Sequence, residues 1–251
     1  MPRASAGVRS ARFKKYGPRA KTLFKQMNMP EKLREALRFL ETITTGEALF
    51  ALIACVYAAG TPEYALIVRA HDIAKREMHH IRRHSGERAF RHAFRCVLML
   101  WLYSGVRDPD CIAAMFLHDL AETFRNKWTR ERLTREFNSR VAELVMGLTK
   151  PVQVDGLSKH GVEKKYYLVQ LPSIVADILM YVVEMKAIDV LDNLLTLWKR
   201  SVKRLGRKID DVVRYVLPLL HAHGLDGLRK AILLVLWEIR RKLRNGVAFA
   251  H

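Results

Sequence analysis

Apolar side chains recur about every 3.6 residues from Pro30 to the C-terminal region, which is the repeat of an amphipathic α-helix. Two helix starts are marked by an N-cap residue followed by proline, at Thr61-Pro62 and at Asp108-Pro109. No segment shows a convincing alternation of apolar and polar residues of the kind that strands require. The pattern therefore predicts an all-α fold, built as a multi-helix bundle.

Breaks in this period divide the chain. We expect helices over residues 62–82, 89–104, 109–123, 129–146, 171–185, 186–203, 207–222 and 225–244, with the longest loop at 150–162, where Pro, Gly and polar residues gather. Residues 1–29 contain eight Lys or Arg and no acidic residue, which predicts a flexible basic leader. Residues 30–63 are expected to add a helical extension before the central helices.

The charge balance restricts the partners. Forty-four Lys and Arg against 25 Asp and Glu give a net charge of +19, which favours an anionic partner such as a nucleotide, a nucleic acid or an acidic surface.

The three cysteines lack CxxC spacing and lie in apolar surroundings, so we expect buried free thiols. No signal peptide is evident, and the longest apolar runs fall short of the ~18–20 residues of a membrane span. We expect a cytoplasmic protein without a membrane anchor.

The dipeptide His118-Asp119 follows the apolar run 112–117, where a charged Asp needs a partner. Glu122 lies four residues after His118, so on a helix both project from one face. His92 and Asp189, together with His118 and Asp119, make a set of two imidazoles and two carboxylates. This mixed set suits a catalytic Mn, Fe or similar divalent ion better than structural zinc. With a coordination position left open, such an ion activates water and neutralises phosphoryl oxygens, which indicates a metal-dependent phosphohydrolase.

The chain contains a second dipeptide of the same kind, His71-Asp72. It has no Glu three residues after the Asp, and it precedes the strongly charged stretch 75–88. We therefore expect His71-Asp72 to be a solvated or capping pair.

Four motifs in order resemble those of one family. They are Arg83-His84-Ser85-Gly86-Glu87 followed by His92; the stretch 113–122 around the dyad, AAMFLHDLAE; Phe137 with 141–150, VAELVMGLTK; and Lys186-Ala187-Ile188-Asp189 with Asn193 and Thr196. The stretch from about Tyr64 to Leu197 thus resembles the HD hydrolase domain of the RelA/SpoT family, including its stand-alone small alarmone hydrolases. That domain removes the 3′-pyrophosphate of (p)ppGpp with a Mn ion. The resemblance implies an HD-domain bundle at 64–198. Outside it, the residues predict extra N-terminal helices and basic C-terminal helices at 199–251 packed on the same domain.

The resemblance also implies roles. The metal ligands would be His92, His118, Asp119 and Asp189. The catalytic residues would be Glu122 and Asp119. The substrate-binding residues would be Arg83, Ser85, Asn193 and Thr196. The cofactor would be Mn²⁺ or another divalent ion such as Fe²⁺, Co²⁺ or Mg²⁺. Several positions depart from the family pattern. Thr123 stands where an Asp usually follows the catalytic Glu, and Asp192 stands where a His commonly precedes the Asn. Arg88-Ala89 replaces the family's Pro-Tyr, and Met78 and Ile81 replace its His and Gln ahead of the Arg.

Three functions remain open from the sequence. The first is hydrolysis of a (p)ppGpp-like nucleotide, the basic surface helping to draw in a polyanion. The second is hydrolysis of another nucleotide or phosphate ester, such as an adenine alarmone, a deoxynucleotide or a nucleoside monophosphate. The third is a basic, helical nucleic-acid-binding protein with a non-catalytic metal site, although no recognisable nucleic-acid-binding motif supports it. The sequence does not fix the oligomeric state.

Overall fold

The computed structural model describes residues 45–83, 86–151, 158–196 and 202–244. All regular elements in these ranges are helices, which confirms the all-α prediction; the one β feature is an isolated bridge between Arg82 and Arg88. The basic leader, residues 30–44 of the N-terminal extension, and Ser85 lie outside the described residues.

The first half of the bundle runs from α4 to α10. Its helices are α4 (Gly46–Ala54), α5 (Pro62–Glu77), α6 (Ala89–Met99), α7 (Pro109–Leu117), α8 (Leu120–Thr123), α9 (Arg130–Glu136) and α10 (Ser139–Leu148). A π-helical turn, η1 (Leu100–Ser104), continues α6. The two expected N-caps are present, because Thr61 accepts a hydrogen bond from the backbone N–H of Tyr64 and Asp108 accepts one from that of Asp110.

The second half runs from α11 to α15. Its elements are α11 (Lys159–Lys165), the π-helical η2 (Tyr166–Gln170), the 3₁₀ turn η3 (Leu171–Ser173), α12 (Ala176–Leu195), α13 (Val202–Asp211), the π-helical η5 (Val212–Val216), α14 (Leu217–Ala222) and α15 (Asp226–Arg244). The expected boundary between residues 185 and 186 is wrong, since α12 continues through it without a break.

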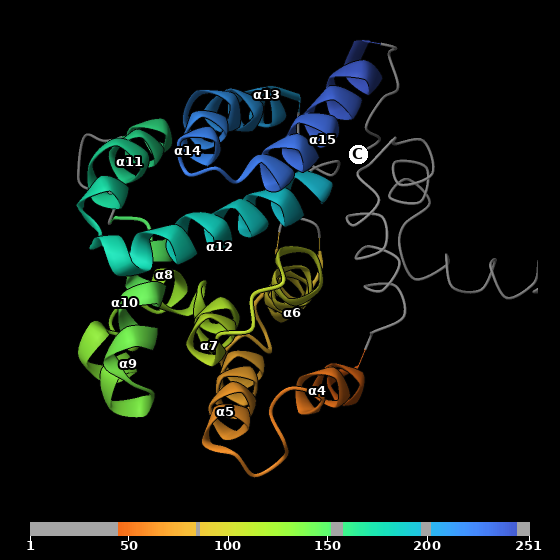
Figure 1. Ribbon diagram of the computed structural model, residues 1–251. Helices are drawn as coiled ribbons and strands as arrows, with labels where there is room; N and C mark the ends of the chain where they lie inside the picture. Colours follow the sequence, from red (N-terminus) through yellow and green to blue (C-terminus); the bar gives the residue numbers. More distant parts are fainter. Residues whose placement is uncertain (1–44, 84–85, 152–157, 197–201, 245–251) are drawn as a thin grey trace, which may run out of the picture.

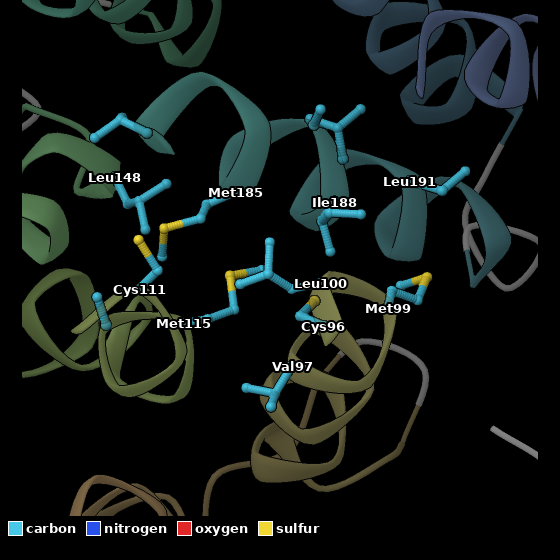
Figure 2. Close-up of a cluster of buried hydrophobic side chains, with 14 of the residues drawn as sticks. Cys96, Val97, Met99, Leu100, Cys111, Met115, Leu148, Met185, Ile188 and Leu191 are labelled. Atoms are coloured by element: carbon cyan, nitrogen blue, oxygen red, sulfur yellow. The ribbon is translucent and has the colours of Figure 1, made fainter. Parts of the chain in front are cut away.

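Helix α12 runs through the middle of the bundle. It packs against α6, α7 and α10 on one side and against α14 and α15 on the other (Figure 1). Figure 2 shows Ile188 and Leu191 of α12 facing Cys96 and Met99 of α6. Because it is covered on both sides, α12 buries nearly every residue from Val182 onward, charged ones included. A charge on this helix must therefore find its partner inside the protein.

Two smaller expectations also need correction. Cys96 and Cys111 are buried as expected, but Cys55 is exposed because it lies at the C-cap of α4, at the edge of the bundle. The expected helix over 129–146 is two helices, because the side chain of Asn138 caps α10 by accepting from the backbone N–H of Val141 at 2.7 Å.

Candidate metal centre

Two helices and the junction between two others bring the expected ligands together. His92 lies on α6, Asp189 lies on α12, and His118 and Asp119 occupy the junction between α7 and α8. The sequence predicted one continuous helix over 109–123, and this is wrong at the dyad. Helix α7 ends at Leu117 and α8 begins at Leu120, so the dyad forms a bend between two helices. The bend allows both side chains of the dyad to point toward α6 and α12.

The distances within the cluster are short. Nε2 of His92 lies 3.2 Å from Nε2 of His118 and 3.1 Å from Oδ1 of Asp189. Nε2 of His118 lies 3.4 Å from Oδ1 of Asp119 and 3.9 Å from Oδ1 of Asp189. Oδ2 of Asp119 lies 3.8 Å from Nε2 of His92. His92, His118 and Asp119 therefore each have a ligand atom within 4.8 Å of the other two, and Asp189 joins this group through its contacts with the two histidines.

The opposite nitrogen of each imidazole is already occupied. Nδ1 of His118 lies 2.8 Å from the backbone oxygen of Met115, which can only accept, so this nitrogen carries the hydrogen. Nδ1 of His92 lies 2.6 Å from Oδ2 of Asp192 and donates to that carboxylate. In their neutral forms both imidazoles therefore present an Nε2 lone pair to the other and to the two Asp carboxylates. Such a group of acceptors is unfavourable unless a cation lies between them.

The donor set fits a divalent ion. Adjacent ligands of an octahedral ion with bonds of about 2.1 Å are about 3 Å apart, close to the shorter spacings seen here. The electrostatics of the site also favour a cation. Burial opposes a positive charge on His92, but Cys96, Asp189 and Asp192 outweigh burial and raise the pKa of His92 well above its usual value. Burial likewise opposes ionisation of Asp189, but Lys186 and the two histidines hold the pKa of this carboxyl well below its usual range. The site favours positive charge at its centre.

Two of the four expected substrate-binding residues, Arg83 and Asn193, lie beside Asp189. Asn193 donates from Nδ2 to Oδ1 of Asp189 and accepts at Oδ1 from Nη2 of Arg83. The other terminal nitrogen of Arg83, Nη1, is buried and has no hydrogen-bond partner among the described residues. Thr196 lies at the C-cap of α12, where its hydroxyl donates to the backbone oxygen of Asp192 at 2.9 Å. Arg83 and Asn193 are thus joined to the ligand cluster, whereas the hydroxyl of Thr196 is used by the helix end.

The expected catalytic carboxylate, Glu122, is half-buried on α8. It lies close enough to Lys186 and Tyr166 to act on their pKa values, together with the stronger effects of burial and of Asp189. Lys186 in turn donates to Oδ2 of Asp189 at 2.9 Å. Glu122 is therefore on the side of the cluster where Lys186 and Asp189 meet.

Sequence reasoning missed the residues that hold the ligands. Asp192 was seen only as a departure from a family pattern, but it is buried and binds His92. Arg95 pairs with both Asp192 and Glu87. The available signal was spacing, because Arg95 lies three residues after His92 and Asp192 lies three after Asp189, so each shares a helix face with a ligand.

The second His-Asp pair is built differently. His71 is buried among the rings of Phe50, Phe90 and Phe116, and Nδ1 of His71 lies 2.7 Å from Oδ1 of the exposed Asp72. The expectation of a solvated or capping pair is wrong for His71, because aromatic side chains on three helices enclose it. No third metal-ligating side chain accompanies this pair among the described residues.

An all-helical bundle with a convergent His/Asp cluster defines a class of metal-binding proteins, and the comparison with known families agrees. A family model described as the HD domain matches residues 70–216, more than half of the chain, so the chain belongs to the HD domain family. Members of this family are in general metal-dependent phosphohydrolases. No curated protein matches the chain. None of the described helices is long and apolar enough to cross a membrane.

Proposed function

We propose that this protein is a divalent-metal-dependent phosphohydrolase that removes the 3′-pyrophosphate of (p)ppGpp-like nucleotides. The observation that carries the metal-dependent step is the pair of Nε2 atoms, 3.2 Å apart, whose opposite nitrogens are both held in hydrogen bonds. The substrate class is supported by the ordered motifs and by Arg83, whose buried Nη1 beside the cluster has no hydrogen-bond partner within the part of the chain that the structure describes. Residues 64–198 remain our proposal for the hydrolase domain, with 199–251 packed on it.

In this proposal His92, His118, Asp119 and Asp189 hold the ion, Mn²⁺ in the first instance. When bound, the ion supplies the charge that lowers the pKa of an attacking water and neutralises phosphoryl oxygens. Glu122 accepts the proton of that water as its oxygen attacks phosphorus. The bond between the 3′ oxygen and phosphorus breaks, which gives pyrophosphate and GDP or GTP.

Arg83 and Asn193 serve substrate binding. The planar guanidinium of Arg83 suits stacking on a base, and its free N–H can donate to an acceptor on the nucleotide. Asn193 keeps the guanidinium beside the metal ligand Asp189. Because Asn193 contacts both groups, it also sets how far the base lies from the reacting phosphate. Ser85 and Thr196 complete the proposed pocket.

The experiment measures pyrophosphate and phosphate release by purified protein with Mn²⁺ against a panel that includes ppGpp and ppApp. We expect Mn²⁺-dependent pyrophosphate release from ppGpp that is lost in Asp119→Asn and in Glu122→Gln. Asp72→Asn is the matched control, because it changes the second His-Asp pair, where no further ligand is present. Its activity should equal that of the wild type.

Other outcomes would redirect the proposal. If only ppApp, a deoxynucleotide or another phosphate ester were hydrolysed, the proposed phosphohydrolase activity would stand and the proposed substrate would be wrong. The exposed Thr123, where the resembled family has a second carboxylate, makes this the main competing function. Metal binding without turnover of any panel member would refute the enzyme and favour a binding protein.

A further inference from the structure

The two imidazoles of the cluster are oriented by different means. His118 is held by a backbone oxygen three residues earlier, so the fold of α7 itself fixes its ring. His92 is held by Asp192, a side chain on another helix and 100 residues further along the chain. The orientation of His92 therefore depends on whatever holds Asp192.

Asp192 is held by a bidentate ion pair. Nε of Arg95 donates to Oδ1 at 2.7 Å and Nη2 donates to Oδ2 at 3.0 Å, while Oδ2 also accepts from His92. Only 1% of Asp192 is exposed. Burial opposes its ionisation, but Arg95 and His92 lower the pKa of its carboxyl well below the usual value. With Arg95 on both oxygens, Asp192 is poorly placed to bind a metal itself, although it forms a close group with His92 and Cys96.

Arg95 is fixed in turn by Glu87. Nη2 of Arg95 lies 2.9 Å from Oε2 of Glu87, and Nη1 contacts the other carboxylate oxygen. The backbone oxygen of Glu87 accepts from the backbone N–H of Arg83 at 2.8 Å. A continuous chain of hydrogen bonds thus leads from the segment that carries Arg83 to the ligand His92.

The arrangement braces α6 and α12 against each other. Each helix supplies one ligand, His92 or Asp189, and one turn later one partner of the ion pair across the interface, Arg95 or Asp192. An ion bound between the ligands would pull on the same interface. A movement of either helix would break the ion pair between Arg95 and Asp192 and, at the same time, turn Nε2 of His92 away from the other ligands.

We propose that Asp192 and Arg95, anchored by Glu87, are positioning residues that fix the ring and the tautomer of His92 for a divalent ion. The proposal rests on the metal site of the proposed function and names the residues that set its affinity. A carboxylate that accepts from Nδ1 also makes Nε2 a stronger electron donor, and loss of such a partner typically weakens metal binding by about 10–100-fold.

The main test is the affinity of Asp192→Asn for Mn²⁺, measured by titration calorimetry in the absence of any nucleotide. Asn offers one acceptor oxygen and one N–H₂ group, so either His92 or Arg95 must face a donor. We expect binding about 10–100-fold weaker than in the wild type. The Co²⁺-loaded variant should also show an altered visible absorption spectrum, which reports ligand geometry and which a general loss of stability would not change.

Asp72→Asn is the matched control, because it removes the same type of Asp–Nδ1 contact from His71, away from the cluster. It should bind Mn²⁺ with wild-type affinity. If Asp192→Asn fails to fold, as judged by circular dichroism, Arg95→Lys replaces it. Lys keeps the charge but loses the fork to Asp192 and Glu87, and we expect a loss near the lower, about tenfold, end of the range.

Each outcome decides the proposal. Wild-type affinity within twofold in a folded Asp192→Asn or Arg95→Lys would overturn it and leave the metal site intact. Absence of divalent-ion binding in the wild type would overturn both this proposal and the metal-dependent step of the proposed function. Weakened binding in the variants of a protein that hydrolyses no nucleotide would support the positioning role and refute only the proposed activity.

Discussion

Glu163 of α11 should make one of the largest single electrostatic contributions to the stability of this fold. Its Oε1 lies 2.8 Å from Nζ of Lys150 and 3.8 Å from Nζ of Lys208, and 15% of its side chain is exposed. Burial by itself would raise the pKa of Glu163. The ammonium groups of Lys208, Lys150 and Lys186 outweigh it and lower the pKa from 4.5 to about 2.

The size of the effect follows from this difference in pKa. A folded-state pKa of about 2 against 4.5 in the unfolded chain corresponds to about 3 kcal/mol of stability at neutral pH. Since the folded-state pKa is the lower one, this contribution is fully present above pH 4.5 and is lost as the pH falls toward 2. At pH 3 less than half of it should remain.

We therefore expect Glu163→Gln to lower the free energy of unfolding by about 3 kcal/mol at pH 7. Urea unfolding of both proteins at pH 7 and pH 3 measures it, and the difference between them should shrink at the lower pH. Glu136→Gln is the control, since Glu136 pairs with the half-exposed Arg69, and an exposed pair of this kind contributes about 0.2–1 kcal/mol. A loss below 1 kcal/mol, or one that is equal at both pH values, would refute the reasoning.

Two further predictions concern packing and pH. Gly147→Ala should lower the free energy of unfolding by about 1–3 kcal/mol, because the added Cβ would lie 2.9 Å from Cγ2 of Val182 and 3.2 Å from Cδ1 of Ile174. Gly206→Ala is the control. Its added Cβ would have open space around it, so this change should instead stabilise α13 by about 0.5–1 kcal/mol. Urea unfolding of the two variants tests this, and equal effects would contradict it. Burial among aromatic rings holds the pKa of His71 below its usual value, so the unfolded chain protonates His71 more readily than the folded protein does. The stability of the protein therefore falls as the pH drops through the usual histidine range. His71→Leu should remove that part of the pH dependence of Tm between about pH 7.5 and 5.5, and an unchanged slope would show that His71 is not buried in its neutral form.

Sequence periodicity predicted the helices well where local signals mark their ends. Thr61-Pro62 and Asp108-Pro109 start helices as expected, because a side-chain cap and a proline act within one turn. It failed at the junction of 185 and 186, where α12 continues without a break. Lys186 is buried and paired with Asp189, so the helix continues.

The candidate site shows the same division between local and distant information. Asp189 and Asn193 are four residues apart, a spacing that places both on one face of a helix, and they are hydrogen-bonded to each other. The pairing of Arg95 with Asp192 could not be predicted, because the two residues are 97 positions apart and only the packing of α6 on α12 brings them together. Nor could periodicity reveal the bend at His118-Asp119, where two apolar helices continue on either side.

The buried charges of α12 are more than folding requires. Lys186, Asp189 and Asp192 all lie in the interior, where transferring an ion from water costs several kcal/mol unless it is paired. Replacing such pairs by apolar side chains of similar volume is often neutral or stabilising. A central helix selected for stability alone would therefore need none of them. Their pairing partners are Asp189 for Lys186, and His92 and Arg95 for Asp192, so every one of these charges ends at a residue of the metal cluster or at its support. Under the proposed function, the cation that the cluster would hold accounts for keeping them.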